Sequence, residues 1–212
     1  MSFIQASIEG TRLRRATGRA RGVRSLLEDA AIRMGTPILP PNGIPGFETE
    51  RLVMRGHRLE DLADCCAMWG DAEVTRHIGG RPFPRDEVWT KLLRYVGHWA
   101  VLGFGFWVIL EKTSGRFVGE VGFADFKRDF QPSLEGTPEI GWVLAPWAHG
   151  RGLATEAVQG ALAWQAMHLA APRTVCLIGP ENRPSIRVAE KCGYREFLRA
   201  TYKGGPVLLF ER

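Results

Sequence analysis

The sequence predicts a domain of the α/β class, in which a mixed sheet carries helices on both faces. Runs rich in β-branched and aromatic residues alternate with segments whose apolar residues recur three or four apart, which is typical of strands and amphipathic helices. The chain of 212 residues is long enough to bury one sizeable core. Its composition, 45% hydrophobic and 24% charged, is that of an ordinary globular protein.

The first 46 residues differ in charge from the rest. They hold seven arginines and three acidic residues, whereas the remaining 166 hold 21 basic and 20 acidic residues. We therefore divide the chain into an extension, 1–46, and a domain, 47–212. Within the extension the sequence allows a basic helix over 17–34, followed by a Pro- and Gly-rich linker or arm at 37–46. The near-neutral domain argues against a body built to bind nucleic acid, although an arm that contacts RNA or a second subunit stays open.

Other classes of protein are disfavoured by the remaining bulk features. No stretch approaches the roughly 20 consecutive apolar residues that span a bilayer, and the N-terminus lacks the apolar core of a secretory signal. The four cysteines are Cys65, Cys66, Cys176 and Cys192. Because they show no metal-like Cys-x-x-Cys spacing and two are adjacent, we expect reduced cytosolic thiols and no metal. Together with the lack of an apolar span or signal, this predicts a cytoplasmic protein without membrane contact.

The elements follow from local patterns. In the first half we expect a strand at 50–55, a helical stripe from Leu59 to Trp69, a short helix at 72–78 that begins at Asp71, a helix at 85–102, and a hairpin of strands 105–110 and 117–124. In the second half we expect a strand at 139–144, a helix at 153–169, a strand at 174–178, a helix at 181–192 that ends at Gly193, and strands at 194–201 and 206–211.

A glycine-rich turn connects the strand at 139–144 to the helix at 153–169. The first turn of a helix has backbone N–H groups without partners and a partial positive charge, so it attracts phosphate. Gly150 and Gly152 allow a sharp turn without side chains in the way, Arg151 adds positive charge, and Ala154 is small. The sequence therefore predicts a pyrophosphate site here. Neither the dinucleotide fingerprint, which Thr155 breaks, nor the P-loop is matched.

Two motifs carry a resemblance to a known family. His149-Gly-Arg-Gly152-Leu-Ala154 resembles motif A of the GNAT (GCN5-related N-acetyltransferase) superfamily, Gln/Arg-x-x-Gly-x-Gly/Ala, with His149 in place of the usual Gln or Arg. Farther along, Asn182-Arg-Pro-Ser185, a short helix and Gly193-Tyr194 resemble motif B. Trp147 and the run Ala-Thr-Glu-Ala at 154–157 resemble the RimJ/RimL-like branch, which acetylates ribosomal-protein N-termini. The resemblance spans roughly 47–212.

The resemblance implies an acyl-CoA N-acyltransferase fold, a central mixed and mostly antiparallel sheet, and an acetyl-CoA-dependent N-acetyltransferase. It also implies direct transfer in a ternary complex, and a homodimer is plausible for the family. A backbone N–H of the central strand, within 142–144, would polarise the thioester carbonyl. The residues that it assigns to acetyl-CoA are Trp142, Val143, Leu144, His149, Gly150, Arg151, Gly152, Leu153, Ala154, Thr155, Asn182 and Ser185.

The catalytic assignments are Glu139 and Ser185. Glu139 on the central strand is our first candidate for the base, Glu120 on the neighbouring strand is its rival, and water alone is a third possibility. Many relatives carry a tyrosine acid seven residues after the motif-B asparagine, but here that position is Ala189. Ser185 occupies the place where the RimJ/RimL-like branch has a serine close to the coenzyme sulfur.

The acceptor stays open at this point, as a protein N-terminus or a small amine such as an amino acid, polyamine or aminoglycoside. The near-neutral domain lacks the acidic character expected for a polycationic aminoglycoside. A non-catalytic module that binds or senses acyl-CoA is the alternative function, because of Ala189 and the unassigned base.

Overall fold

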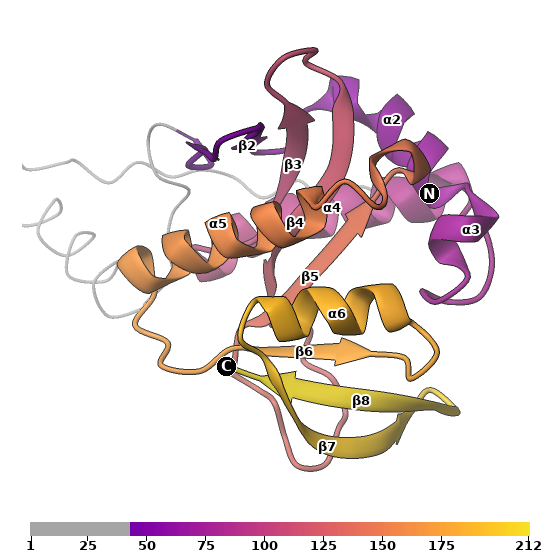
Figure 1. Cartoon of the computed structure of the whole chain (residues 1–212), viewed down its shortest axis with the longest axis vertical. Helices are drawn as coiled ribbons and strands as arrows, with labels where there is room; N and C mark the ends of the chain where they lie inside the picture. The colour runs from indigo at the N-terminus through magenta and orange to yellow at the C-terminus, as the bar shows by residue number, and fades with distance from the viewer. Residues whose placement is uncertain (1–42) are drawn as a thin grey trace, which may run out of the picture. The chain divides into compact units, whose positions relative to one another are not determined.

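The computed structural model describes residues 43–212, and the predicted helix at 17–34 lies outside them. These residues form one eight-stranded sheet in the order β1-β2-β3-β4-β5-β6-β8-β7 (Figure 1). Every neighbouring pair is antiparallel except β5 and β6, which are parallel. The predicted mixed sheet is confirmed. Within the described residues no helix has the length and apolar character needed to cross a membrane.

The elements up to the middle of the sheet are β1 (Phe47–Glu48), β2 (Leu52–Arg55), the 3₁₀ turn η1 (Leu59–Asp61), α2 (Leu62–Trp69), α3 (Ala72–Thr75), α4 (Arg85–Leu102), β3 (Phe106–Glu111) and β4 (Phe117–Ala124). They are followed by β5 (Glu139–Leu144), η2 (Pro146–Ala148), α5 (Leu153–His168), β6 (Val175–Ile178), α6 (Arg183–Lys191), β7 (Arg195–Tyr202) and β8 (Gly205–Glu211).

Local chemistry explains most of these boundaries. The Asp71 carboxylate caps α3 by accepting hydrogen bonds from the backbone N–H groups of Glu73 and Val74. The turn from β7 to β8 consists of Lys203 and Gly204, both with positive φ, as a tight two-residue hairpin requires. The sequence did not indicate β1 or the two 3₁₀ turns, because elements of two or three residues are too short to show a period.

The helices cover opposite faces of the sheet. Along β4 and β5, Val121 and Leu144 pack in the core that α5 covers, whereas Val143 packs in a second core with residues of α2 and α4. Since successive side chains of a strand point to opposite faces, Glu120 and Glu139 lie on the side of α2 and α4. The two strands therefore direct apolar side chains toward α5 and both candidate carboxylates toward α2 and α4.

The parallel pair β5 and β6 holds together only at its start. Its register contains one pair, Glu139 with Val175, after which the two strands diverge (Figure 1). On the other side β5 stays paired with β4 along its whole length, from Glu139 to Leu144. The far half of β5 thus has one free edge, and both candidate pockets open along it.

Two residues that precede the predicted domain start at residue 47 contact the domain. Ile44 packs against the core, and the Trp107 indole N–H donates to the Pro45 carbonyl at 2.7 Å. Both residues belong to the segment that the sequence indicated as linker. A proline-rich segment gives no periodic signal of burial, so this contact was not predictable from the pattern.

Candidate active site

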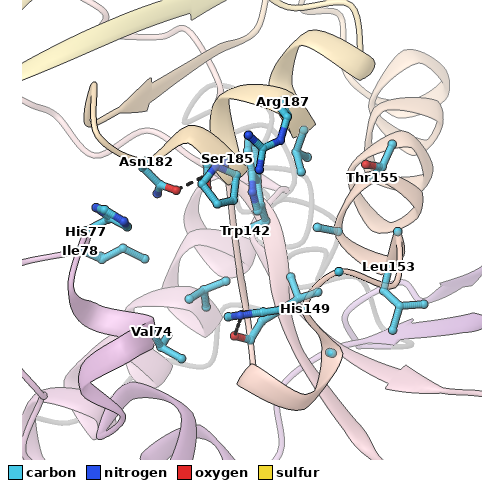
Figure 2. Close-up of a pocket in the computed structure, with 18 of the residues that line it drawn as sticks. Val74, His77, Ile78, Trp142, His149, Leu153, Thr155, Asn182, Ser185 and Arg187 are labelled. Carbon is cyan, nitrogen blue, oxygen red and sulfur yellow. Dashed lines mark hydrogen bonds between the residues drawn. The ribbon is translucent and has the colours of Figure 1, made fainter.

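Two pockets meet beside the free edge of β5. The first has a volume of about 420 Å³ and lies between the end of β5, the turn at 148–155 and α6 (Figure 2). The second has a volume of about 850 Å³ and lies on the α4 side, bounded by β5, β6 and the turn from β7 to β8. Six residues line both pockets: His77, Ile78, Trp142, Val143, Asn182 and Ser185. We call this shared region the junction.

The turn that begins α5 has the geometry of an anion site. Gly150 and Gly152 adopt left-handed φ angles of 72° and 76°, which side chains rarely tolerate. The first hydrogen bond of the helix runs from the Glu156 N–H to the Gly152 carbonyl. The three amides before it, at 153–155, therefore precede the helical pattern and stand at the positive end of the helix dipole. All three residues line the first pocket.

Side chains from other elements hold this turn in place. The His149 Nε2–H donates to the Leu144 carbonyl at 2.9 Å, which ties the turn to the end of β5 (Figure 2). Arg51 donates to the Arg151 carbonyl at 3.0 Å and forms an ion pair with Glu156 at 2.6 Å. The same Glu156 carboxylate accepts from the Thr49 hydroxyl. The first turn of α5 is thus anchored from both sides.

Arg151 is placed differently from the other predicted ligands of the coenzyme. It does not line the first pocket, while all the other assigned residues do. Its guanidinium pairs with Glu111 at the end of β3 at 2.8 Å and lies 5.1 Å from the centre of the Trp147 ring. A single long side chain on a tight turn can point to either side, and here an acidic partner on β3 is within reach.

The positive charges of the first pocket come from residues that sequence reasoning did not assign. Arg76 follows α3, and Arg187 and Lys191 are one turn apart on α6. The spacing of four residues between Arg187 and Lys191 places them on one helix face, and this signal was available in the sequence. Arg76 has no comparable signal, because only the fold brings the segment after α3 to this pocket.

The direction of the β5 amides follows from its pairing with β4. The Ala145 N–H donates to the Val118 carbonyl of β4, and backbone groups alternate sides along a strand. The Val143 N–H therefore points to β4, whereas the amides of Trp142 and Leu144 point toward the free edge. Of the three amides that the family resemblance proposes, these two are directed toward the pockets.

Asn182 and Ser185 lie at the start of α6. The Asn182 side-chain oxygen accepts from the Ser185 N–H at 3.2 Å and caps the helix (Figure 2). This hydrogen bond fixes the Asn182 side chain and the first turn of α6, from which Ser185 lines both pockets. Ala189, one turn further along α6, is fully buried and lines neither pocket.

Glu139 lines the second pocket as part of an ion pair. Its two carboxylate oxygens accept from the Nε and NH2 groups of Arg128, each at 2.7 Å. The Arg128 guanidinium also stacks over Phe126 and Tyr202, with distances of 4.6 and 4.8 Å to the ring centres. A carboxylate in this bidentate pair would have to give up a strong interaction to accept a proton.

Glu120 is completely buried and lines neither pocket. Its oxygens accept from Trp69 Nε1 at 3.0 Å and Cys65 Sγ at 3.3 Å, and His57 Nε2 lies 3.0 Å away. Burial alone would raise the pKa of this carboxyl group, but the bonds from His57, Trp69 and Cys65 outweigh it and lower the pKa. The sequence suggested Glu120 as the rival base, and the fold places it inside this network.

The same network contains the three groups that come closest to a metal-binding set. Ligand atoms of His57, Cys65 and Glu120 lie within 4.8 Å of one another. Burial, followed by the nearby Glu120 charge, raises the pKa of the Cys65 thiol, which keeps it protonated. Since a metal ligand must be a thiolate and both Glu120 oxygens already accept hydrogen bonds, these residues fit a hydrogen-bonded network better than a metal site.

His77 enters the junction from the segment that follows α3 (Figure 2). The sequence indicated a surface or core histidine, because nothing local distinguishes it. In the structure it is half-buried and is the only residue with an ordinary acid–base side chain among the six that line both pockets. Histidine is the residue type that most often transfers protons in enzymes, so His77 becomes a candidate for that role.

Comparison with known proteins identifies the class. Residues 51–195 match the family model for an acetyltransferase (GNAT) domain. The uncharacterized N-acetyltransferase p20 of Bacillus licheniformis is 29% identical over 150 residues, which are 70% of this chain and 81% of that protein. The chain belongs to the GNAT acetyltransferase family.

Solved structures agree with this assignment. A Bordetella pertussis protein assigned to the GNAT-family acetyltransferases is 33% identical, with a TM-score of 0.70, over 79% of this chain and 99% of that one. The fold is also shared with the spermidine N-acetyltransferase of Vibrio cholerae, which was solved with CoA and spermine. That enzyme is 17% identical, with a TM-score of 0.61, over 77% of this chain and 96% of its own.

Proposed function

We propose that this acetyltransferase uses acetyl-CoA to acetylate a primary amine by direct transfer in a ternary complex. The observation that carries the proposal is the junction, where the first pocket, lined by the turn that begins α5, meets a second pocket of about 850 Å³. Because six residues line both, a group held in the first pocket and an amine held in the second would meet there without any relay through a protein nucleophile.

The first pocket fits the phosphates and pantetheine of coenzyme A. The amides at 153–155 and the left-handed glycines 150 and 152 would hold the pyrophosphate. Arg76, Arg187 and Lys191 supply positive charge around it. The free edge of β5 offers the amides of Trp142 and Leu144 to the pantetheine arm and the thioester. Acetyl-CoA would supply the acetyl group, and the residues of the first pocket would orient its thioester toward the junction.

The transfer forms a C–N bond between the amine and the acetyl carbon, and it breaks the C–S bond of the thioester. An N–H of Trp142 or Leu144 would stabilise the negative charge that develops on the carbonyl oxygen. The Ser185 hydroxyl, at the junction, would hydrogen-bond the departing thiolate. The amine loses a proton, and the sulfur gains one when CoA leaves as a thiol.

Two side chains compete as acceptor of the amine proton, with water as the third choice. Glu139 lines the second pocket but is held by Arg128. His77 lies at the junction itself. We place His77 first, because it can take a proton without breaking an ion pair.

The acceptor class is the finer part of the proposal. The residues around Trp147 and Ala154 resemble the RimJ/RimL-like branch, whose acceptors are protein N-termini, but sequence resemblance in this branch is a poor guide to the acceptor. Small amines are the other class. The alternative function, a non-catalytic module that binds acyl-CoA, is favoured by Ala189 at the place of the usual tyrosine acid. It predicts coenzyme binding without turnover.

Thermal unfolding with acetyl-CoA, CoA and NAD tests the coenzyme. A ligand at 100 times its dissociation constant stabilises the folded state by about 2.7 kcal/mol, which gives a clear rise in the melting temperature. We expect a rise with both CoA species and none with NAD. No rise with either CoA species would remove the proposal. Thiol release during an amine screen then separates the enzyme from the binding module.

A further inference from the structure

The second pocket carries more positive than negative charge. Four cations line it, Lys91, Arg94, Arg128 and Lys203, against two carboxylates, Glu87 and Glu139. Both carboxylates already have partners, because Glu139 pairs with Arg128 and Glu87 pairs with Arg81 at 2.7 Å. A ligand that enters this pocket therefore meets uncompensated positive charge.

Lys91, which is half-buried, and Arg94, which is exposed, are neighbouring sources of this charge. They stand three residues apart on α4, so they share one helix face. Within residues 43–212 neither has a carboxylate oxygen within 4.0 Å. Aromatic rings hold them instead: Lys91 Nζ lies 4.1 Å from the centre of the Trp69 ring, and the Arg94 guanidinium lies 5.0 Å from that of Phe126.

The lowered pKa of Lys91 is consistent with a site for an anion. Burial, and then the neighbouring Arg94 charge, lower the pKa of Lys91 to about 8, against the smaller opposing effects of the Glu120 and Glu87 charges. Both causes act against the ammonium form. An anion bound between Lys91 and Arg94 would remove the repulsion and make the charged form favourable again.

We propose that the acceptor is a small primary amine that also carries a carboxylate or phosphate group, and that Lys91 and Arg94 bind this anionic group. The inference rests on the proposed function and names its substrate class. The pocket, at about 850 Å³, lies within the usual size of small-molecule sites, roughly 300–1,000 Å³. The same charges repel polyamines and aminoglycosides, so the pocket discriminates by repulsion as well as by attraction.

Matched substrate pairs test the proposal directly. We would compare amino acids with their carboxamides, and glucosamine with glucosamine 6-phosphate, and would include spermidine as a polycationic amine. The assay measures the release of the CoA thiol from acetyl-CoA. The acid-bearing member of at least one pair should have a kcat/KM about tenfold or more above its partner, as a charge-assisted contact implies. A preference for spermidine, or for the acid-free member of every pair, overturns the proposal. A preference for peptides over all small amines overturns it as well.

Variants connect the preference to the two cations. Arg94→Gln should raise KM for the acid-bearing amine about tenfold with little change in kcat, and should leave its acid-free partner unaffected. Arg85→Gln is the matched control, because Arg85 begins the same helix but does not line the pocket. If Arg94→Gln and Arg85→Gln behave alike, Arg94 does not bind the anionic group.

Binding measurements keep this inference separate from the proposed function. In the presence of saturating CoA, the acid-bearing amines should raise the melting temperature of the wild type more than their acid-free partners do, and Arg94→Gln should abolish the difference. If CoA binds but no difference appears, the substrate class is wrong while the coenzyme proposal stands. If CoA itself fails to stabilise the protein, the proposed function falls first.

Discussion

The two pockets differ in whether main-chain or side-chain groups are proposed to hold the ligand. In the first pocket the groups that we propose for the pyrophosphate are main chain, namely the amides at the start of α5 beside the left-handed glycines 150 and 152. In the second pocket the groups that we propose for the acceptor are side chains, chiefly Lys91 and Arg94 of α4. A main-chain site depends on local conformation, which would suit a coenzyme that stays the same among relatives. A side-chain site can be altered one residue at a time, which suits an acceptor that differs among relatives.

The largest effect should come from the proton acceptor at the junction. His77→Gln should lower kcat by about 10²-fold or more, as loss of a general base typically does, while the affinity for acetyl-CoA stays within about twofold. Steady-state kinetics and calorimetric titration measure the two quantities. Glu139→Gln is the comparison. If Glu139→Gln abolishes turnover at unchanged melting temperature and His77→Gln does not, the assignment of the base must be reversed.

The next effect concerns the main chain of the first pocket. Gly152→Ala places a Cβ on a residue with φ of 76°, where the left-handed region costs about 1–2 kcal/mol. We expect acetyl-CoA to bind about tenfold more weakly, with the acceptor preference unchanged. Gly204→Ala, also at positive φ but in the hairpin turn, controls for the general loss of stability. Equal loss of coenzyme affinity in both variants would contradict a specific role for the turn at Gly152.

A smaller effect separates two arginines near the coenzyme. Arg187→Gln removes a charge that lines the first pocket and should weaken CoA binding several-fold, more strongly at low than at high salt. Arg151→Gln removes a charge paired with Glu111 and should leave CoA binding within about twofold. Titrations at two ionic strengths decide the matter. The opposite order would restore Arg151 as the phosphate ligand.

The smallest effect is a pH dependence in the second pocket. Because the pKa of Lys91 is lowered to about 8, its charge is present below that pH and is lost above it. The ratio of kcat/KM for an acid-bearing amine to that for its acid-free partner should therefore fall above pH 8. In Lys91→Arg the ratio should persist to higher pH, because guanidinium stays charged. Identical profiles in both proteins would exclude Lys91 from anion binding.

Much of the fold was predictable because its elements are locally consistent. The expected helix at 85–102 coincides with α4, and the expected strand at 139–144 coincides with β5. The order of strands was not predictable in the same way. β8 lies between β6 and β7 because it pairs with both, and pairing partners are chosen by the three-dimensional packing of apolar faces rather than by local pattern.

The candidate site also has features that the local sequence indicates and features that depend on distant residues. The turn at 149–155 and the start of α6 were readable, since glycine positions and helix caps act through the nearest backbone. The sequence could not assign the pairing of Glu139 with Arg128, the burial of Glu120 or the position of His77, because each depends on a partner distant in the chain.

By itself, the sequence determined the fold class, the central strand and the glycine-rich turn at 149–155, because periodicity, proline and glycine act over a few neighbouring residues. The family came from the resemblance of two short motifs, which can be compared without a structure. Only the tertiary structure decided that Glu139 is paired and Glu120 buried, which arginines line the first pocket and what charge lines the second. These properties depend on distances between side chains that are remote in sequence. The Coulomb energy of two charges is set by their separation and by how deeply they are buried, not by their sequence separation.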